Sequence, residues 1–145
     1  MREVVVTGGG TGIGYAIAAS FVEAGDRVTI TGRREAVLAA AAARLGATPV
    51  AIDATDPAAV EAALPSLPER VDVLVNNAGG NTDIGRAEPA DLAGLAAAWW
   101  DNLAANVLSA VLVTAALTPG LAEGGRFVSL GSIAARTGAG SYGAA

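Results

Sequence analysis

The sequence predicts an α/β protein in which one parallel β-sheet carries helices on both faces. Short runs of β-branched residues alternate with longer alanine-rich segments, which is the rhythm of βαβ units. Glycines follow the first of these runs at once, so the chain turns sharply there. With 52% hydrophobic and 16% charged residues, the 145-residue chain has enough apolar surface to form one domain, residues 1–145.

Five strands are expected where valine, isoleucine and threonine cluster between turn signals. They cover Glu3–Thr7, Arg27–Thr31, Thr48–Ile52, Val71–Val75 and Arg126–Leu130.

Three helices are expected between the first four strands, over Ile13–Ala24, Arg34–Leu45 and Pro57 to about Leu67. Each has a terminus signal: Gly25 and Gly46 end the first two, and Asp56 caps the third. After the fourth strand we expect a loop over Asn76–Pro89. Two helical segments follow, from Asp91 to about Ala98 and from Trp100 to about Leu117. After the fifth strand, Gly131–Ala145 is expected to be loop-like until its last few residues.

Composition excludes several classes of function. The chain has no cysteine and no histidine, so no metal site built on thiolate or imidazole is expected. A net charge of -5 with only nine lysines and arginines argues against nucleic acid and anionic membranes as partners. The apolar segments are expected to be interrupted before they reach the length of a membrane span. A cytoplasmic protein is the expectation.

The turn after the first strand reads Thr7-Gly8-Gly9-Gly10-Thr11-Gly12-Ile13-Gly14. The common dinucleotide fingerprint G-x-G-x-x-G does not fit it, whereas T-G-x-x-x-G-x-G does. Glycines at these points allow a tight turn and a close backbone approach to a pyrophosphate at a helix N-terminus. The alternative is a glycine-rich turn without a ligand. A P-loop is excluded because no Lys-Ser/Thr pair follows the last glycine.

The end of the second strand indicates which dinucleotide would bind. An acidic residue at this point would accept the ribose 2′-hydroxyl of NAD(H), but the chain has Gly32-Arg33-Arg34. A guanidinium can pair with a 2′-phosphate through two hydrogen bonds. The sequence therefore favours NADP(H) over NAD(H), and the alternative is that both arginines are simply solvated.

With Asn76-Asn77-Ala78-Gly79 after the fourth strand, the glycine turn resembles the pattern of the classical short-chain dehydrogenases/reductases. The resemblance covers the whole chain. It implies a Rossmann-type doubly wound sheet with strand order 3-2-1-4-5 and the later strands missing. It also implies a cofactor site with Asp53 and Ala54 at the adenine, and with Asn77, Ala78 and Gly79 at the ribose. The alternative for the Asn-Asn-Ala-Gly stretch is an ordinary polar turn.

The resemblance also implies a catalytic set of Asn106, Ser132 and Tyr142. Ser129 is the rival of Ser132. Tyr142 looks like the start of Tyr-x-x-x-Lys, whose lysine would occupy position 146. A lysine four residues after a tyrosine shares its helix face and lowers the phenol pKa. The phenol then exchanges a proton with a carbonyl or alcohol, Ser132 holds the substrate oxygen, and Asn106 helps to hold a water.

Two departures from the family pattern are expected to matter. The spacing from Ser132 to Tyr142 is short, so the Arg136–Gly140 loop must be tight. The lysine and the later strands are absent, so the chain as given is expected to be inactive.

Three readings follow. The first is an NADP(H)-dependent oxidoreductase of ketones and secondary alcohols that forms a homodimer or homotetramer at full length. Trp99 and Trp100 would then serve packing or subunit contacts. The second is a non-catalytic dinucleotide-binding module. The third is an inert truncation with the fifth strand as an exposed apolar edge.

Overall fold

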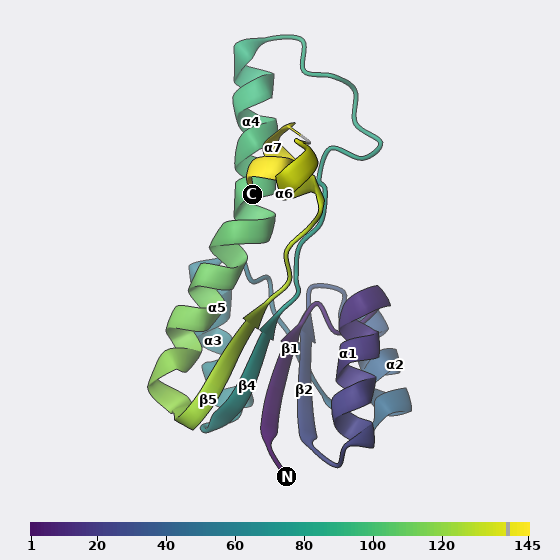
Figure 1. The fold of residues 1–145 in the computed structure, drawn as a ribbon, viewed down its shortest axis with the longest axis vertical. Helices are drawn as coiled ribbons and strands as arrows, with labels where there is room; N and C mark the ends of the chain where they lie inside the picture. Colours follow the sequence, from purple (N-terminus) through teal and green to yellow (C-terminus); the bar gives the residue numbers. More distant parts are fainter. Residues whose placement is uncertain (139) are drawn as a thin grey trace.

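The computed structural model, which describes residues 1–138 and 140–145, has the predicted five-stranded sheet. All strand pairs are parallel, and the order is β3-β2-β1-β4-β5 (Figure 1). The prediction of a Rossmann-type α/β fold is therefore confirmed. The strands are β1 Glu3–Thr7, β2 Arg27–Gly32, β3 Thr48–Ala51, β4 Val71–Asn76 and β5 Leu121–Ser129.

The central strand β1 is buried on both faces, which explains why its sequence is an unbroken run of valines. Val4 and Val6 join one core cluster, and Val5 joins the other. This alternation follows from the period of two along a strand. The first core lies against the helices α1 Gly12–Glu23 and α2 Glu35–Leu45, and the second against α3 Pro57–Ala63 and α5 Ser109–Leu117.

The chain between β4 and β5 contains one long helical run, so the predicted break near Trp99 is wrong. The run consists of α4 Leu92–Leu103, a π-helical turn η2 over Ala104–Leu108, and α5. No proline or glycine occurs near Trp99 to stop the helix. The irregularity lies instead around Asn106. A short 3-10 turn, η3 Thr118–Gly120, ends the run, and another, η1 Leu64–Ser66, follows α3.

This helical run also corrects the expectation that no segment is long and apolar enough to cross a membrane. Leu92–Gly120 spans 29 residues with a mean hydropathy of 1.6. Its few polar residues are outweighed by alanine, leucine and valine. Length and composition alone support a membrane span only weakly, because core helices of soluble proteins pass the same test. Here Val113 and Leu117 of the run pack into the second core.

The C-terminal region contains more regular structure than expected. Strand β5 begins at Leu121 rather than at Arg126, with a shift in its pairing to β4 between Val71 and Val73. After β5, two short helices replace most of the predicted loop: α6 Ala134–Thr137 and α7 Gly140–Ala144. The predicted tight loop Arg136–Gly140 includes Ala139, which lies outside the described residues.

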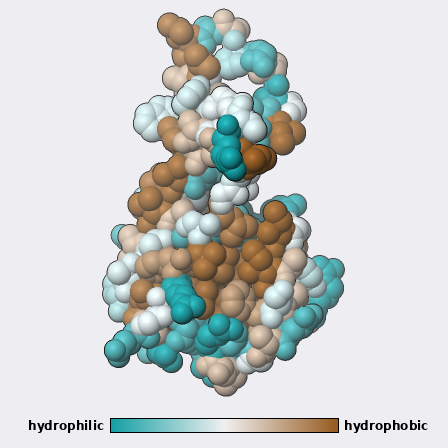
Figure 2. Space-filling model, in the orientation of Figure 1, coloured by the Kyte–Doolittle hydropathy of each residue, from teal (hydrophilic) through white to brown (hydrophobic). Residues whose placement is uncertain are grey.

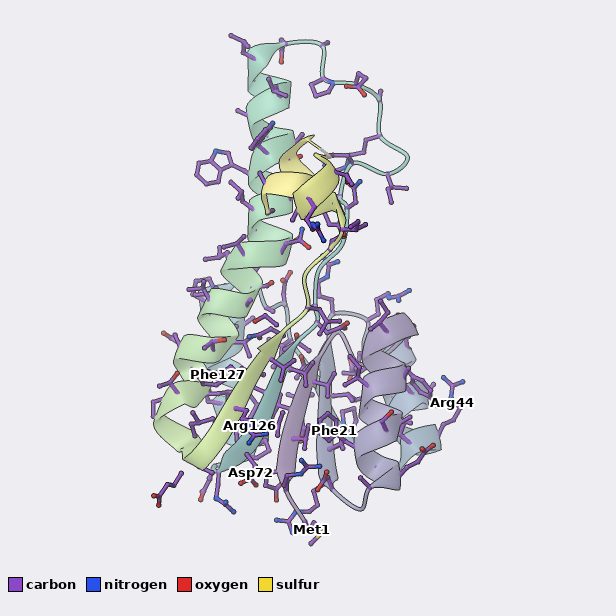
Figure 3. The ribbon with its side chains drawn as sticks, in the orientation of Figure 1. Met1, Phe21, Arg44, Asp72, Arg126 and Phe127 are labelled. Atoms are coloured by element: carbon purple, nitrogen blue, oxygen red, sulfur yellow. The ribbon has the colours of Figure 1, made fainter. Side chains whose placement is uncertain are left out.

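Figure 1 shows α6 and α7 beside α4, beyond the end of the sheet. They form, with α4 and the loop before it, an upper lobe above the carboxyl ends of the strands. The space-filling view narrows between this lobe and the body that holds the sheet, and apolar side chains gather on the body (Figure 2). Strand β5, which carries Arg126 and Phe127 (Figure 3), forms one edge of the sheet. Phe127 and Val128 on this strand are 40% and 44% exposed.

Candidate active site at the carboxyl ends of the strands

A cleft of about 1050 Å³ opens at the carboxyl ends of the strands and is lined by residues of the sheet region and of the upper lobe. In open α/β sheets this is the edge at which ligands bind. The predicted residues that line it are Gly8, Thr11, Ile13, Gly14, Arg33, Arg34, Asp53, Ala54, Asn77, Ala78, Gly79, Asn106, Ser132 and Tyr142. Gly12 does not line the cleft, although both of its neighbours do.

The glycine turn is packed so closely that side chains would not fit. Gly8 has a φ of 66°, and a Cβ added to it would lie 2.9 Å from the side-chain nitrogen of Asn77. A Cβ on Gly14 would overlap the Gly8 carbonyl and the same Asn77 side chain. The first and last glycines of the motif are therefore needed to bring β1, the start of α1 and the Asn77 loop together.

Thr7, the first residue of the motif, joins this turn to the loop after β4, and this role was not predicted. Its hydroxyl donates to the Val75 carbonyl and accepts from the backbone N–H groups of Asn77 and Ala78, at 3.0 and 2.9 Å. The Asn77 side chain donates in return to the Thr7 carbonyl at 2.9 Å. The position of Thr7 directly before the first glycine was the available signal.

Helix α1 begins at the cleft without a side-chain cap. Asp56 and Asp91 accept backbone hydrogen bonds at the N-termini of α3 and α4. At α1 the N-cap residue is Thr11, and its side chain accepts no capping bond. The first backbone N–H groups of a helix have no partner within the helix. Those of α1 are therefore placed to bind an anion in the cleft, as a pyrophosphate requires.

A carboxylate and a cation, Asp53 and Arg33, both line the cleft after β3 and β2. Asp53 accepts hydrogen bonds from the backbone N–H and the hydroxyl of Thr55, at 3.0 and 2.8 Å. These bonds, together with the positive charge of Arg33, lower the pKa of Asp53 below its ordinary value. The Asp53 carboxylate is thus ionised at neutral pH and can accept a hydrogen bond from an amino group.

Replacing Thr55 with valine removes one of these donors at nearly constant volume. We expect the pKa of Asp53 to rise, because its ionised form loses a hydrogen bond. A depressed carboxyl pKa contributes stability that is present above the unfolded-state pKa and is lost as the pH falls through the folded-state pKa. The variant should therefore lose less stability on acidification than the parent. Carboxyl carbon shifts followed by NMR against pH measure the pKa, and an unchanged titration would contradict this assignment.

Asn106 in the π-helical turn lines the cleft and holds the loop after β4 through two hydrogen bonds to Gly80. Its side-chain oxygen accepts from the Gly80 N–H at 2.8 Å, and its nitrogen donates to the Gly80 carbonyl at 3.0 Å. Gly79 has a φ of 154°, and a Cβ there would overlap the Asn106 side-chain oxygen. The last glycine of Asn-Asn-Ala-Gly is therefore what allows the loop to approach the helix.

Ser132 and Tyr142 reach the same cleft from the segment after β5. The Ser132 hydroxyl accepts from the Ala134 N–H at 3.2 Å, at the start of α6. Tyr142 lies in α7. Ser129 lines the cleft too, so it stays a rival of Ser132. Three polar residues behind Tyr142 were not predicted: Asp83, Asn102 and Ser141 hydrogen-bond to one another.

Comparison with known proteins assigns the family. The family model described as short chain dehydrogenase matches residues 2–145. This chain belongs to the short-chain dehydrogenase family. Its relatives include a Mycobacterium tuberculosis protein named as an oxidoreductase, 36% identical over 88% of this chain and 57% of the relative. Another is the NADP-dependent 3-hydroxy acid dehydrogenase of Salmonella typhimurium, 37% identical over 90% of this chain and 54% of the relative.

Solved structures of the short-chain dehydrogenase family have the same fold. A short-chain type dehydrogenase/reductase from Mycobacterium ulcerans superposes with a TM-score of 0.85 at 31% identity, over 99% of this chain and 56% of the other. A serine dehydrogenase complexed with NADP+ superposes with a TM-score of 0.80 at 33% identity, over 98% of this chain and 60% of the other. The chain spans about half the length of the curated relatives it matches.

Proposed function

We propose that this chain is the cofactor-binding part of an oxidoreductase that transfers hydride between NADP(H) and a ketone or secondary alcohol. One observation carries the proposal: a single cleft is lined by the glycine turn, by Arg33 and by Asn106, Ser132 and Tyr142. The first two suit a phosphorylated dinucleotide, and the last three supply hydroxyl and amide groups for a substrate oxygen.

The residues present fit NADP(H) along the length of the cleft. The uncapped N-terminus of α1 would hold the pyrophosphate. Arg33 would pair with the 2′-phosphate, and Asp53 would accept the adenine amino group. The relatives and neighbours that are named for NADP bear out the preference for NADP(H) over NAD(H). When bound, the nicotinamide supplies the hydride.

The chain's own groups would orient the substrate and move the proton. The Ser132 hydroxyl would hydrogen-bond the carbonyl oxygen, and the Tyr142 phenol would donate the proton that this oxygen needs on reduction. Asn106 would anchor the loop after β4 and help to hold a water. A lysine at position 146, one helical turn beyond Tyr142, would complete the set, and without it we expect little or no turnover.

The substrate would be a small carbonyl or alcohol in the cytoplasm, with neither nucleic acid nor membrane as a partner. At full length a homodimer or homotetramer is expected. Trp99 and Trp100 are 41% and 69% exposed on α4 and would contribute to subunit contacts.

A binding titration and a turnover assay test the proposal separately. NADPH added to the purified protein should quench the emission of Trp99 and Trp100, and NADH should bind more weakly. The full-length protein should then oxidise NADPH with a panel of ketones, followed by loss of the nicotinamide absorbance. Binding without turnover at full length would favour a non-catalytic dinucleotide-binding module. Absence of binding would contradict both readings.

A further inference from the structure

Behind the cleft, Asp83, Asn102 and Ser141 form a closed ring of hydrogen bonds that the proposed reaction does not use. The Asn102 side-chain nitrogen donates to the Asp83 carboxylate and to the Ser141 hydroxyl, each at 2.9 Å. The Ser141 hydroxyl donates in turn to the same carboxylate oxygen of Asp83, at 3.0 Å. Each side chain in the ring thus bonds to the other two.

Two of the three members of the ring are buried, and Asp83 is partly buried. Asn102 is fully buried and Ser141 is 4% exposed. Buried polar groups stabilise a structure only when their partners are in place, because an unpaired one costs free energy. The Asn102 side-chain oxygen is also satisfied, since it accepts from the Thr82 N–H at 3.0 Å. Loss of one member would leave the others buried with too few partners.

The ring joins three segments that are distant in the sequence. Asp83 belongs to the loop after β4, Asn102 to α4, and Ser141 to α7. Ser141 directly precedes Tyr142. Asn102 lies one turn before Asn106, and its carbonyl accepts from the Asn106 side-chain nitrogen at 2.9 Å. Two of the three candidate catalytic residues are therefore linked to the ring: Tyr142 as the neighbour of Ser141, and Asn106 through its hydrogen bond to Asn102.

Helix α7 lies beyond the end of the sheet and packs against α4 and α6 (Figure 1). Most of the stability of a helix in a protein comes from such tertiary packing. On its other side α7 approaches α6 closely at Gly143, where an added Cβ would lie 2.9 Å from the Ala134 carbonyl. This contact sets the distance between the two short helices. It does not attach either of them to α4, whereas the ring does.

We propose that Asp83, Asn102 and Ser141 are positioning residues that hold α7 against α4, so that the Tyr142 phenol stays directed into the cleft opposite Asn106. The proposal rests on the function assigned to Tyr142. A displacement of about 1 Å at a reacting group can lower a rate about 100-fold, so an anchor behind the tyrosine has kinetic consequences without touching the substrate.

Ser141→Ala and Asp83→Ala in the full-length protein test the proposal, with Asp83→Asn as the conservative variant that keeps an acceptor oxygen. Hydrogen exchange followed by mass spectrometry should be about tenfold faster in α7 for both alanine variants, with β1 and β4 unchanged. In the double alanine variant the second substitution should add little, because both break one ring. Asp83→Asn should restore most of the protection.

The kinetic readout separates positioning from general stability. We expect kcat to fall about tenfold in the alanine variants while the KM for NADPH stays within twofold. Val60→Ala is the control, because Val60 belongs to the second core and does not line the cleft: the variant should lower the melting temperature and leave kcat unchanged. Unchanged exchange in α7, or exchange that rises equally across the sheet, would overturn the proposal, as would an unchanged kcat in a parent that turns over. If the parent reduces no carbonyl, the proposed function fails, and the exchange data still decide whether the ring holds α7.

Discussion

Replacing Tyr142 with phenylalanine is expected to lower kcat for carbonyl reduction in the full-length protein by about 100-fold or more. The substitution removes only the phenolic oxygen, and proton transfer by a positioned side chain contributes about 10²–10⁴ to a rate. The cleft keeps its shape, so NADPH should bind with unchanged affinity. Turnover is followed through the nicotinamide absorbance and binding through tryptophan emission.

Tyr15 provides the matched control for this prediction. It is the other tyrosine of the chain and lies on α1, where its ring packs against the first core and faces the Arg44 guanidinium at 5.5 Å. Tyr15→Phe should leave kcat within about twofold of the parent, since Tyr15 does not line the cleft and the change removes only its hydroxyl. A Tyr142→Phe variant as active as the parent would remove Tyr142 from the proposed mechanism.

Replacing Arg33 with alanine is expected to weaken NADPH binding by about 10- to 100-fold and to leave NADH binding nearly unchanged. The two cofactors differ in the 2′-phosphate, and hydrogen bonds to charged groups contribute about 1.5–3 kcal/mol. Arg33 lines the cleft at the end of β2, and its charge reaches Asp53 at the end of β3. Titrations of both cofactors at two salt concentrations measure the effect.

Arg44→Ala is the control for charge alone, because Arg44 lies near the end of α2, outside the cleft. It removes the same positive charge and should not change either affinity. If Arg33→Ala weakened NADPH and NADH equally, its guanidinium would be supporting the cleft as a whole. A selective loss in Arg34→Ala instead would assign the phosphate to the neighbouring arginine.

The sheet could be predicted from the sequence because a parallel strand that is buried on both faces is apolar along its whole length. Runs such as Val4–Val6 have no polar position, and the glycines after them mark where the chain leaves the sheet. The sequence also allowed the prediction that the glycine turn and the residues after β2, β3 and β4 line one cleft. Its residues lie immediately after strands, and the carboxyl ends of parallel strands meet at one edge.

The upper lobe was harder to predict because its contacts are not local. Asn102 bonds to partners 19 and 39 positions away in the sequence, and no periodicity links three such residues. Gly131–Ala145 contains four glycines, a composition typical of loops, and yet Ala134–Thr137 and Gly140–Ala144 are helical. There the close packing of Gly143 on α6 decides the local structure.

The π-helical turn at Ala104–Leu108 changes the direction in which side chains point, so α4 and α5 do not share one continuous helical face. Each residue of an α-helix advances the side-chain direction by about 100°, and a π-turn accommodates one residue more than a regular turn. A helical wheel that assumes a regular helix from Leu92 to Leu117 therefore places the side chains of one half of the run on the wrong face. In evolutionary terms, a one-residue deletion here would restore a regular helix and rotate Asn102 relative to α5. Length changes at this turn are thus constrained by the lobe above it as well as by the sheet below.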